Sequence, residues 1–165
     1  MTSESKEKPE KYQRALDWAE QGQYPEALDF IQSYLETSPD DAEALNDIGT
    51  ILWCQGHSNE ALPYLEKARQ FGHNSPEILW NLFEIYLSMQ RGLEAVKLFD
   101  DMERLGILQV DILNRAATVL IDSEDLPEAL STLERSLTVE PQQAILEPIV
   151  QVVRHKLEAR KASVV

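Results

Sequence analysis

One short phrase occurs four times along this chain. It reads GQYPEAL at residues 22–28, GHSNEAL at 56–62, RGLEAV at 91–96 and DLPEAL at 125–130. The alanines of the four copies are Ala27, Ala61, Ala95 and Ala129, whose sequence numbers increase by 34 at each step, and we call this step the repeat period. A period that holds through all four copies indicates internal repetition. The sequence therefore predicts an array of similar units.

Helical spacing of apolar residues surrounds each copy of the phrase. Leu45, Ile48, Gly49 and Leu52 lie three or four positions apart, which places them on one face of a helix. Pro25 stands at the start of a second helix, where its missing N–H costs no hydrogen bond. We interpret the phrase as a turn, a helix start and a small residue that lets neighbouring helices pack closely.

This period, with its paired helices, resembles the tetratricopeptide repeat, whose pattern is W-x2-L-G-x2-Y, then A-x3-F, then Pro. The residues that carry the resemblance are Ala15, Trp18, Ala27 and Ile31; Leu45, Ile48, Gly49, Leu52, Ala61, Leu65 and Ala68; Leu79, Leu82, Phe83, Tyr86, Ala95 and Phe99; and Leu113, Ala116, Ala117, Leu120, Ala129, Leu133 and Ser136. Phe83 occupies a position where a small residue is usual, so we expect local spreading of the helices there. The resemblance covers residues 8–141 and implies an all-α, right-handed α-solenoid of about four helix-turn-helix repeats.

The domain organisation follows from this period. We expect a disordered tail at residues 1–7, repeats at about 8–41, 42–75, 76–109 and 110–141, a C-terminal capping helix at 142–162, and a short tail at 163–165. In the capping helix a single apolar stripe is predicted to cover the last repeat, formed by Ile145, Ile149, Val152, Val153 and Leu157. The basic run at 154–161 could alternatively form a docking patch.

The charge of the chain limits its partners. Its 165 residues include 15 Lys and Arg against 29 Asp and Glu, a net charge of −14. Such a surface repels nucleic acid and anionic lipid and attracts basic partners. The single cysteine, Cys54, excludes an intramolecular disulfide, and no apolar stretch near the N-terminus suggests a signal or an anchor. These features predict a cytoplasmic protein with no membrane insertion.

Signals of catalysis are weak in this sequence. No GxGxxG, GxxxxGK[ST], HExxH or GxSxG motif occurs. The acidic pairs Asp40-Asp41 and Asp100-Asp101 read as solvated charge, and Cys54 has no nearby set of metal ligands. The chain is therefore predicted to be no enzyme and to need neither a metal nor a cofactor.

In tetratricopeptide arrays the concave face comes mainly from the first helix of each pair, which makes it a cradle for a peptide or a helix. Its candidate partner-binding residues here are Tyr12, Glu43, Asn46, Asp47, Thr50, Trp53, Glu77, Trp80, Asn81, Glu84, Asp111, Asn114, Arg115 and Thr118. Trp53 and Trp80 are candidate anchors, with packing between helices as the alternative. The asparagines are candidates for hydrogen bonds to a ligand's main chain, with simple solvent exposure as the alternative.

The resemblance also allows a comparison with tetratricopeptide co-chaperones, which hold acidic tails with two Lys, two Asn and one Arg. The corresponding positions here are Asn46, Thr50, Asn81, Asp111 and Arg115, so only Asn81 and Arg115 match and both lysines are missing. An acidic tail would also meet several carboxylates. We therefore expect a partner that is a basic or amphipathic protein or peptide.

The leading functional prediction is a non-catalytic adaptor or scaffold for protein–protein interaction. Three alternatives stay open. The chain could be a chaperone of the type III secretion class, which resembles it in size, charge and architecture; the regulatory part of a glycosyltransferase or methyltransferase; or a module that self-associates into a homo-oligomer.

Overall fold

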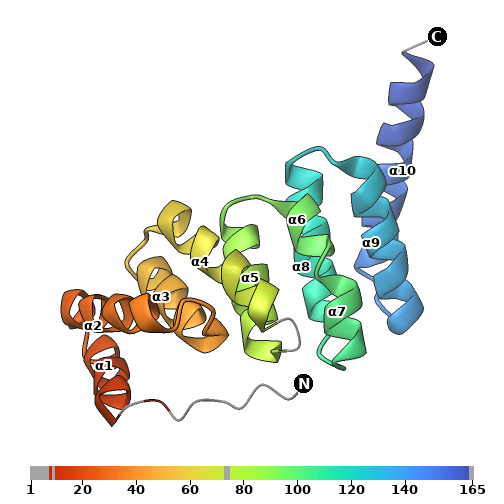
Figure 1. Ribbon diagram of the computed structural model, residues 1–165. Helices are drawn as coiled ribbons and strands as arrows, with labels where there is room; N and C mark the ends of the chain where they lie inside the picture. Colours follow the sequence, from red (N-terminus) through yellow and green to blue (C-terminus); the bar gives the residue numbers. More distant parts are fainter. Residues whose placement is uncertain (1–7, 9, 73–74, 164–165) are drawn as a thin grey trace. The chain divides into compact units, whose positions relative to one another are not determined.

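The computed structural model describes residues 8, 10–72 and 75–163. The tail expected at residues 1–7 and the last two residues of the tail expected at 163–165 lie outside this part. Every regular element in the described residues is an α-helix, which agrees with the predicted all-α class (Figure 1). The chain forms two compact units, Met1–Asn81 and Leu82–Val165, and the boundary falls inside one helix. Each unit is described by itself.

The N-terminal unit contains helix hairpins joined by short turns. Its helices are α1 Glu10–Glu20, α2 Tyr24–Thr37, α3 Ala42–Cys54, α4 Ser58–Phe71 and the first turns of α5 Pro76–Ser88. Asp41 is the N-cap of α3, and its side chain accepts a hydrogen bond from Ala44 N at 3.0 Å. Ala27 and Ala61 are fully buried.

Close packing inside this unit depends on Gly49 of α3. A Cβ atom at Gly49 would lie 2.6 Å from Cγ of Leu65 on α4, far inside van der Waals contact. Leu65 is fully buried, so it has little room to move. The absence of a side chain at Gly49 therefore sets the distance between α3 and α4.

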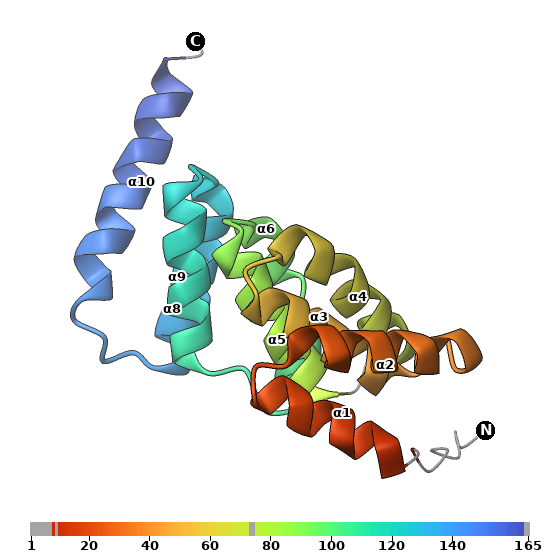
Figure 2. The ribbon, with the colours of Figure 1, turned by 90° about the vertical axis from the view of Figure 1, so that its left-hand side faces the viewer.

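The C-terminal unit contains the remaining hairpins and one unpaired helix. After α5 come α6 Gly92–Val96, α7 Phe99–Arg104, α8 Val110–Asp122, α9 Leu126–Val139 and α10 Leu146–Ala162. Helices α8 and α9 form a hairpin, and α10 packs on α9 (Figure 2).

Phe83 stands one repeat period after Gly49 and faces Phe99, which stands one repeat period after Leu65. Both rings are buried, with their centroids 6.5 Å apart. Two facing rings need more room than Gly against Leu. At this place the second helix of the repeat is divided into α6 and α7, and the N–H of Leu98 bonds to the carbonyl of Ala95 in a tighter i→i−3 turn. The sequence predicted local spreading at Phe83, and the structure shows an interrupted helix beside it.

Helix α10 continues the repeat period. The helices α3, α5 and α8, each the first of its repeat, begin at residues 42, 76 and 110. Helix α10 begins at residue 146, close to one repeat period after the start of α8. Its buried residues Leu146, Val150 and Val153 lie one repeat period after residues of α8 that are also buried, namely Ile112, Ala116 and Val119. Within the described residues, α10 is thus the first helix of a fifth repeat without a second helix.

The apolar stripe predicted for α10 is wrong at two of its five residues. Val153 is buried and Leu157 and Ile149 are half-buried, but Ile145 and Val152 remain 76% and 56% exposed. The side that would hold a second helix carries Glu147, Gln151 and Arg154, which lie one repeat period after Leu113, Ala117 and Leu120. Polar residues on that side are compatible with the predicted role of α10 as a capping helix.

Candidate partner-binding surface

The structure distributes the predicted surface residues over three levels of exposure. Tyr12 and Asn46 are buried; Asp47, Thr50, Trp53, Asn81, Glu84, Asn114 and Arg115 are half-buried; Glu43, Glu77, Trp80, Asp111 and Thr118 are exposed. Glu84, Asp111, Asn114, Arg115 and Thr118 belong to the C-terminal unit and the others to the N-terminal unit. The prediction of an open surface therefore needs correction at Tyr12 and Asn46, because each faces a neighbouring helix.

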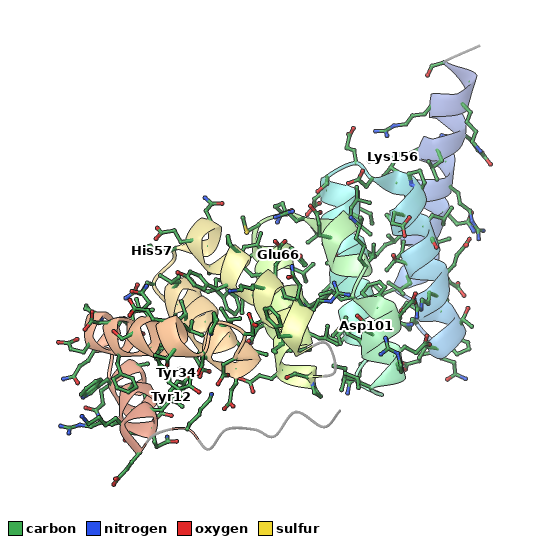
Figure 3. The ribbon with its side chains drawn as sticks, viewed as in Figure 1. Tyr12, Tyr34, His57, Glu66, Asp101 and Lys156 are labelled. Atoms are coloured by element: carbon green, nitrogen blue, oxygen red, sulfur yellow. The ribbon has the colours of Figure 1, made fainter. Side chains whose placement is uncertain are left out.

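Tyr12 of α1 supports Asp47 of α3. The Tyr12 hydroxyl donates a 2.6 Å hydrogen bond to Oδ2 of Asp47, and the ring packs edge-to-face against Phe30 and Tyr34. Figure 3 labels Tyr12 and Tyr34, which lie close together. Tyr34 in turn donates to Oδ2 of Asp41 at 2.8 Å. Two tyrosines thus place two carboxylates along the start of α3.

Burial raises the pKa of Asp47 to about 6. The hydrogen bond from Tyr12 and the ammonium of Lys8 act in the opposite direction, whereas Glu43 and Glu77 add to the increase. Burial raises the pKa of the Tyr12 hydroxyl, and the nearby acids Asp47, Asp41 and Glu43 raise it further. Asp47 is therefore a carboxylate whose negative charge is only partly compensated by this chain.

A chain of amides joins α3 to α5 in the N-terminal unit. Nδ2 of Asn46 donates to Oε1 of Glu77 at 3.1 Å, and Nδ2 of Asn81 donates to Oδ1 of Asn46 at 3.0 Å and to Oγ1 of Thr50 at 3.2 Å. The sequence predicted that Asn46 and Asn81 would bond a ligand or face solvent. The structure instead uses these amide groups to connect adjacent repeats.

Lys8 is the cation that approaches this group of acids within the described part of the N-terminal unit. Its ammonium lies 2.9 Å from Oε2 of Glu43, 3.8 Å from Oδ1 of Asp41 and 4.1 Å from the centre of the Tyr12 ring. No ion pair from a Lys or Arg to Asp47 is present among the described residues. Negative charge therefore exceeds positive charge on this face.

The two candidate tryptophan anchors differ in exposure. Trp80 is 41% exposed on α5, one residue before Asn81 of the amide chain. Trp53 is half-buried near the end of α3. Of the two, Trp80 offers more of its indole ring to a partner.

In the C-terminal unit the predicted residues pair with one another. Arg115 donates two parallel hydrogen bonds to Glu84, from Nη1 to Oε1 and from Nη2 to Oε2, both at 2.7 Å. Its guanidinium also lies 5.5 Å from the centre of the Phe83 ring. These hydrogen bonds raise the pKa of Arg115. The Arg115 guanidinium offsets the negative charge of Glu84, so Glu84 adds little to an acidic surface.

Asn114 belongs to a network that sequence reasoning missed. Its Nδ2 donates to Oε1 of Gln143 at 2.8 Å, and its Oδ1 accepts from Ser136 at 2.6 Å, while Gln143 donates to the carbonyls of Ser136 and Glu140. Ser136 is fully buried at a position where the two preceding repeats have Ala68 and Met102. A serine at a position where the two preceding repeats have apolar side chains was the available signal of this network.

Known proteins share this fold. Residues 42–73 match the family model described as tetratricopeptide repeat. A crystal structure of MamA protein superimposes with a TM-score of 0.66 at 16% identity, covering 93% of this chain and 86% of that one. A crystal structure titled as YrrB, a TPR protein with an unusual peptide-binding site, gives a TM-score of 0.62 at 19% identity, covering 87% and 71%. No curated protein sequence matches the chain.

These findings define the fold: the chain is an α-solenoid that resembles solved tetratricopeptide-repeat structures, and residues 42–73 match the repeat model itself. Arrays of this type present extended surfaces to proteins and peptides. Across the helices that the structure describes, none has the length and apolar character needed to cross a membrane. The same described residues contain no group of three or more His, Cys, Asp or Glu arranged to hold a metal ion.

Proposed function

We propose that this chain is a non-catalytic adaptor that binds a basic or amphipathic protein segment on the acidic face of its N-terminal unit. We define this acidic face as Glu43, Asp47, Glu77, Trp80 and Asn81. The observation that carries the proposal is the environment of Asp47, a desolvated carboxylate among further acids, with no ion pair to a Lys or Arg of the described residues. A partner's Lys or Arg would supply the compensating charge.

The acidic face offers two kinds of contact. Asp47 and Glu77 are fixed in place by Tyr12 and Asn46, so they lose little side-chain freedom when a cation binds. Trp80 provides an exposed aromatic surface for an apolar side chain or for the stem of a lysine. An amphipathic segment would use both contacts.

The proposal includes the cytoplasmic location that the sequence predicts, where Cys54 would stay reduced. The chaperone and enzyme-regulatory alternatives differ from it in the partner. Identifying proteins captured from the native host by mass would separate them, since a secreted client and a linked catalytic domain are different molecules.

The direct test is a fluorescence binding assay with an array of short synthetic peptides that share length and apolar content and vary in net charge. Basic peptides should bind, and acidic ones should not. Glu77→Gln should weaken the best basic peptide about three- to tenfold, because a charge-assisted contact is lost without loss of volume. Glu26→Gln, an exposed acid on α2, is the matched control and should change little.

Two results would contradict the proposal. One is a preference of the wild-type protein for acidic peptides or a failure to bind any basic peptide in the array. The other is an equal effect of Glu77→Gln and Glu26→Gln, which would show that overall charge rather than this face attracts the ligand.

A further inference from the structure

Helix α10 and its N-cap residue carry a second apolar stripe, which lies beside the buried one. Ile145, Ile149 and Val152 lie at i, i+4 and i+7, and Lys156 follows four residues later on the same side. Ile145 is 76% exposed and Val152 is 56% exposed. Leu146, Val150 and Val153 belong to the buried core of this unit, and Ile149 packs partly against it. Ile145 and Val152 lie outside that core, so the fold of this unit does not require these two residues to be apolar.

The repeat period shows which surface this stripe occupies. Ile145, Ile149 and Val152 lie one period after Asp111, Arg115 and Thr118 of α8. Those three residues were predicted from the sequence to line the partner-binding side of the array. At these equivalent positions α8 has polar side chains, whereas α10 and its N-cap have aliphatic ones.

A groove runs between α8 and α10 along this stripe. It has a volume of about 200 Å³ and is lined by Ile121, Pro148, Ile149, Val152, Val153 and Lys156. Five of these six residues are apolar, and the sixth is a cation. A volume of this size accepts one or two apolar side chains of a partner.

The charge at the rim of the groove is opposite to the charge of the chain. The ammonium of Lys156 has no ion pair among the described residues, whereas Arg160 one turn later bonds Oε2 of Glu124 at 2.6 Å (Figure 3 labels Lys156). No carboxylate lines the groove. A ligand that complements it must present carboxylates beside its apolar side chains.

We propose that the α8–α10 groove binds an amphipathic helix of a partner protein that has aliphatic or aromatic residues on one face and acidic residues along its edge. Its apolar residues enter between Ile121 and Val152, and a carboxylate pairs with Lys156. A second copy of this chain fits less well, because a two-fold contact is self-complementary and the stripe of α10 carries no acid to meet Lys156. The groove shares no residue with the acidic face of the N-terminal unit.

The test uses two synthetic helical peptides of equal length with the same leucine positions, one with glutamate and one with lysine along the edges of the apolar face. Fluorescence anisotropy should show the glutamate peptide binding at least tenfold more tightly to the intact protein. Val152→Ser should weaken that binding at least fivefold. Val139→Ser is the control, since Val139 is also 56% exposed but lies on α9 outside the groove, and it should change binding less than twofold.

Charge reversal gives the sharper result. Lys156→Glu should weaken the glutamate peptide at least fivefold and should strengthen the lysine peptide. All three variants change exposed side chains, and circular dichroism would verify that they keep the helical spectrum. Glu77→Gln should leave the glutamate peptide unaffected, so failure of this proposal and failure of the proposed function are distinguishable.

Several outcomes would overturn the proposal. They are equal binding of the two peptides, no binding of the glutamate peptide at millimolar concentration, and equal effects of Val152→Ser and Val139→Ser. A wild-type dimer in sedimentation equilibrium that Val152→Ser converts to a monomer would assign the groove to a second copy and would also overturn it.

Discussion

The hydroxyl of Tyr12 and the carboxylate of Asp47 are 35 residues apart in sequence and 2.6 Å apart in the fold. The bond joins the first helices of two successive repeats. It holds Asp47 at the centre of an acidic face while burial opposes the ionisation of that same carboxyl. One residue pair therefore connects the packing of the repeats to the charge that a partner would meet.

The pKa of Asp47 should be about 6, well above that of a free aspartate. Because the folded state then binds more protons than the unfolded state between about pH 4 and 6, this carboxyl stabilises the protein most at low pH. The free energy of unfolding should fall as the pH rises through that window and then level off. Carboxyl ¹³C NMR measures the midpoint directly, and a midpoint near 4 would contradict the prediction.

Asp47→Asn should remove this pH dependence. An amide oxygen can still accept from Tyr12 and carries no charge to desolvate, so the variant should be more stable than wild type at pH 8 by about 1–2 kcal/mol. Urea unfolding at pH 5.5, 6.5 and 8 would measure the difference, since these values stay above the sequence pI of about 4.5. A difference that does not grow with pH would argue against the assignment.

Tyr12→Phe should destabilise the N-terminal unit by about 1–2 kcal/mol, because it leaves a partly buried carboxylate without its donor. The lost hydrogen bond also favoured the ionised form of Asp47, so the pKa of Asp47 should rise further in this variant. The titration separates this effect from a packing defect, which would leave the pKa where it was.

Gly49→Ala should be destabilising by about 1–3 kcal/mol although alanine favours helix formation by roughly 1 kcal/mol over glycine. The added methyl group would meet Leu65 at 2.6 Å. Combining it with Leu65→Ala should give a loss smaller than the sum of the two single losses, because the shortened side chain makes room for the methyl. Strict additivity in this double-mutant cycle would show that the two residues do not compete for space.

Trp80→Ala should weaken binding of the basic partner segment by about 2 kcal/mol. Trp53→Ala should have the smaller effect on binding, because less of its ring is open to a ligand. Isothermal titration with the best basic peptide compares the two, with circular dichroism as the folding control. A larger loss of binding for Trp53→Ala than for Trp80→Ala would show that the aromatic anchor lies on α3 and not on α5.

Association with a basic partner should slow as salt increases, because the acidic face attracts it over distances of about one Debye length. Stopped-flow rates between about 50 and 500 mM NaCl test this, with the dissociation rate expected to change less. An association rate independent of salt would remove charge as the selector of partners.

The positions Ala27, Ala61, Ala95 and Ala129 were sufficient to predict the helix pairs, because a constant repeat period is visible in one dimension. The sequence was not sufficient to predict the buried and exposed sides of α10. Ile145, Val152 and Val153 fit a single helical stripe almost as well as the two stripes that exist. The sequence cannot show which of two overlapping stripes α9 covers. That choice depends on the direction from which α9 approaches.

The candidate binding surface likewise combines features that the sequence predicts with contacts that only the tertiary structure shows. Asn46 lies at a helix position that the sequence predicts to face a partner, and its spacing does not show which group its amide bonds. Glu77, which accepts its hydrogen bond, lies 31 residues away on another helix. The side-chain amide of Asn114 is likewise hydrogen-bonded by two distant residues, Ser136 and Gln143.

By itself, the sequence determined the repeat period, the helical class and the surplus of acid over base, since each depends on residue type and spacing alone. Only the tertiary structure decided which polar groups are used between repeats, which carboxylate is desolvated and which apolar stripe of α10 stays uncovered. These depend on distances between atoms of different helices. Such distances are set when the hairpins pack against one another.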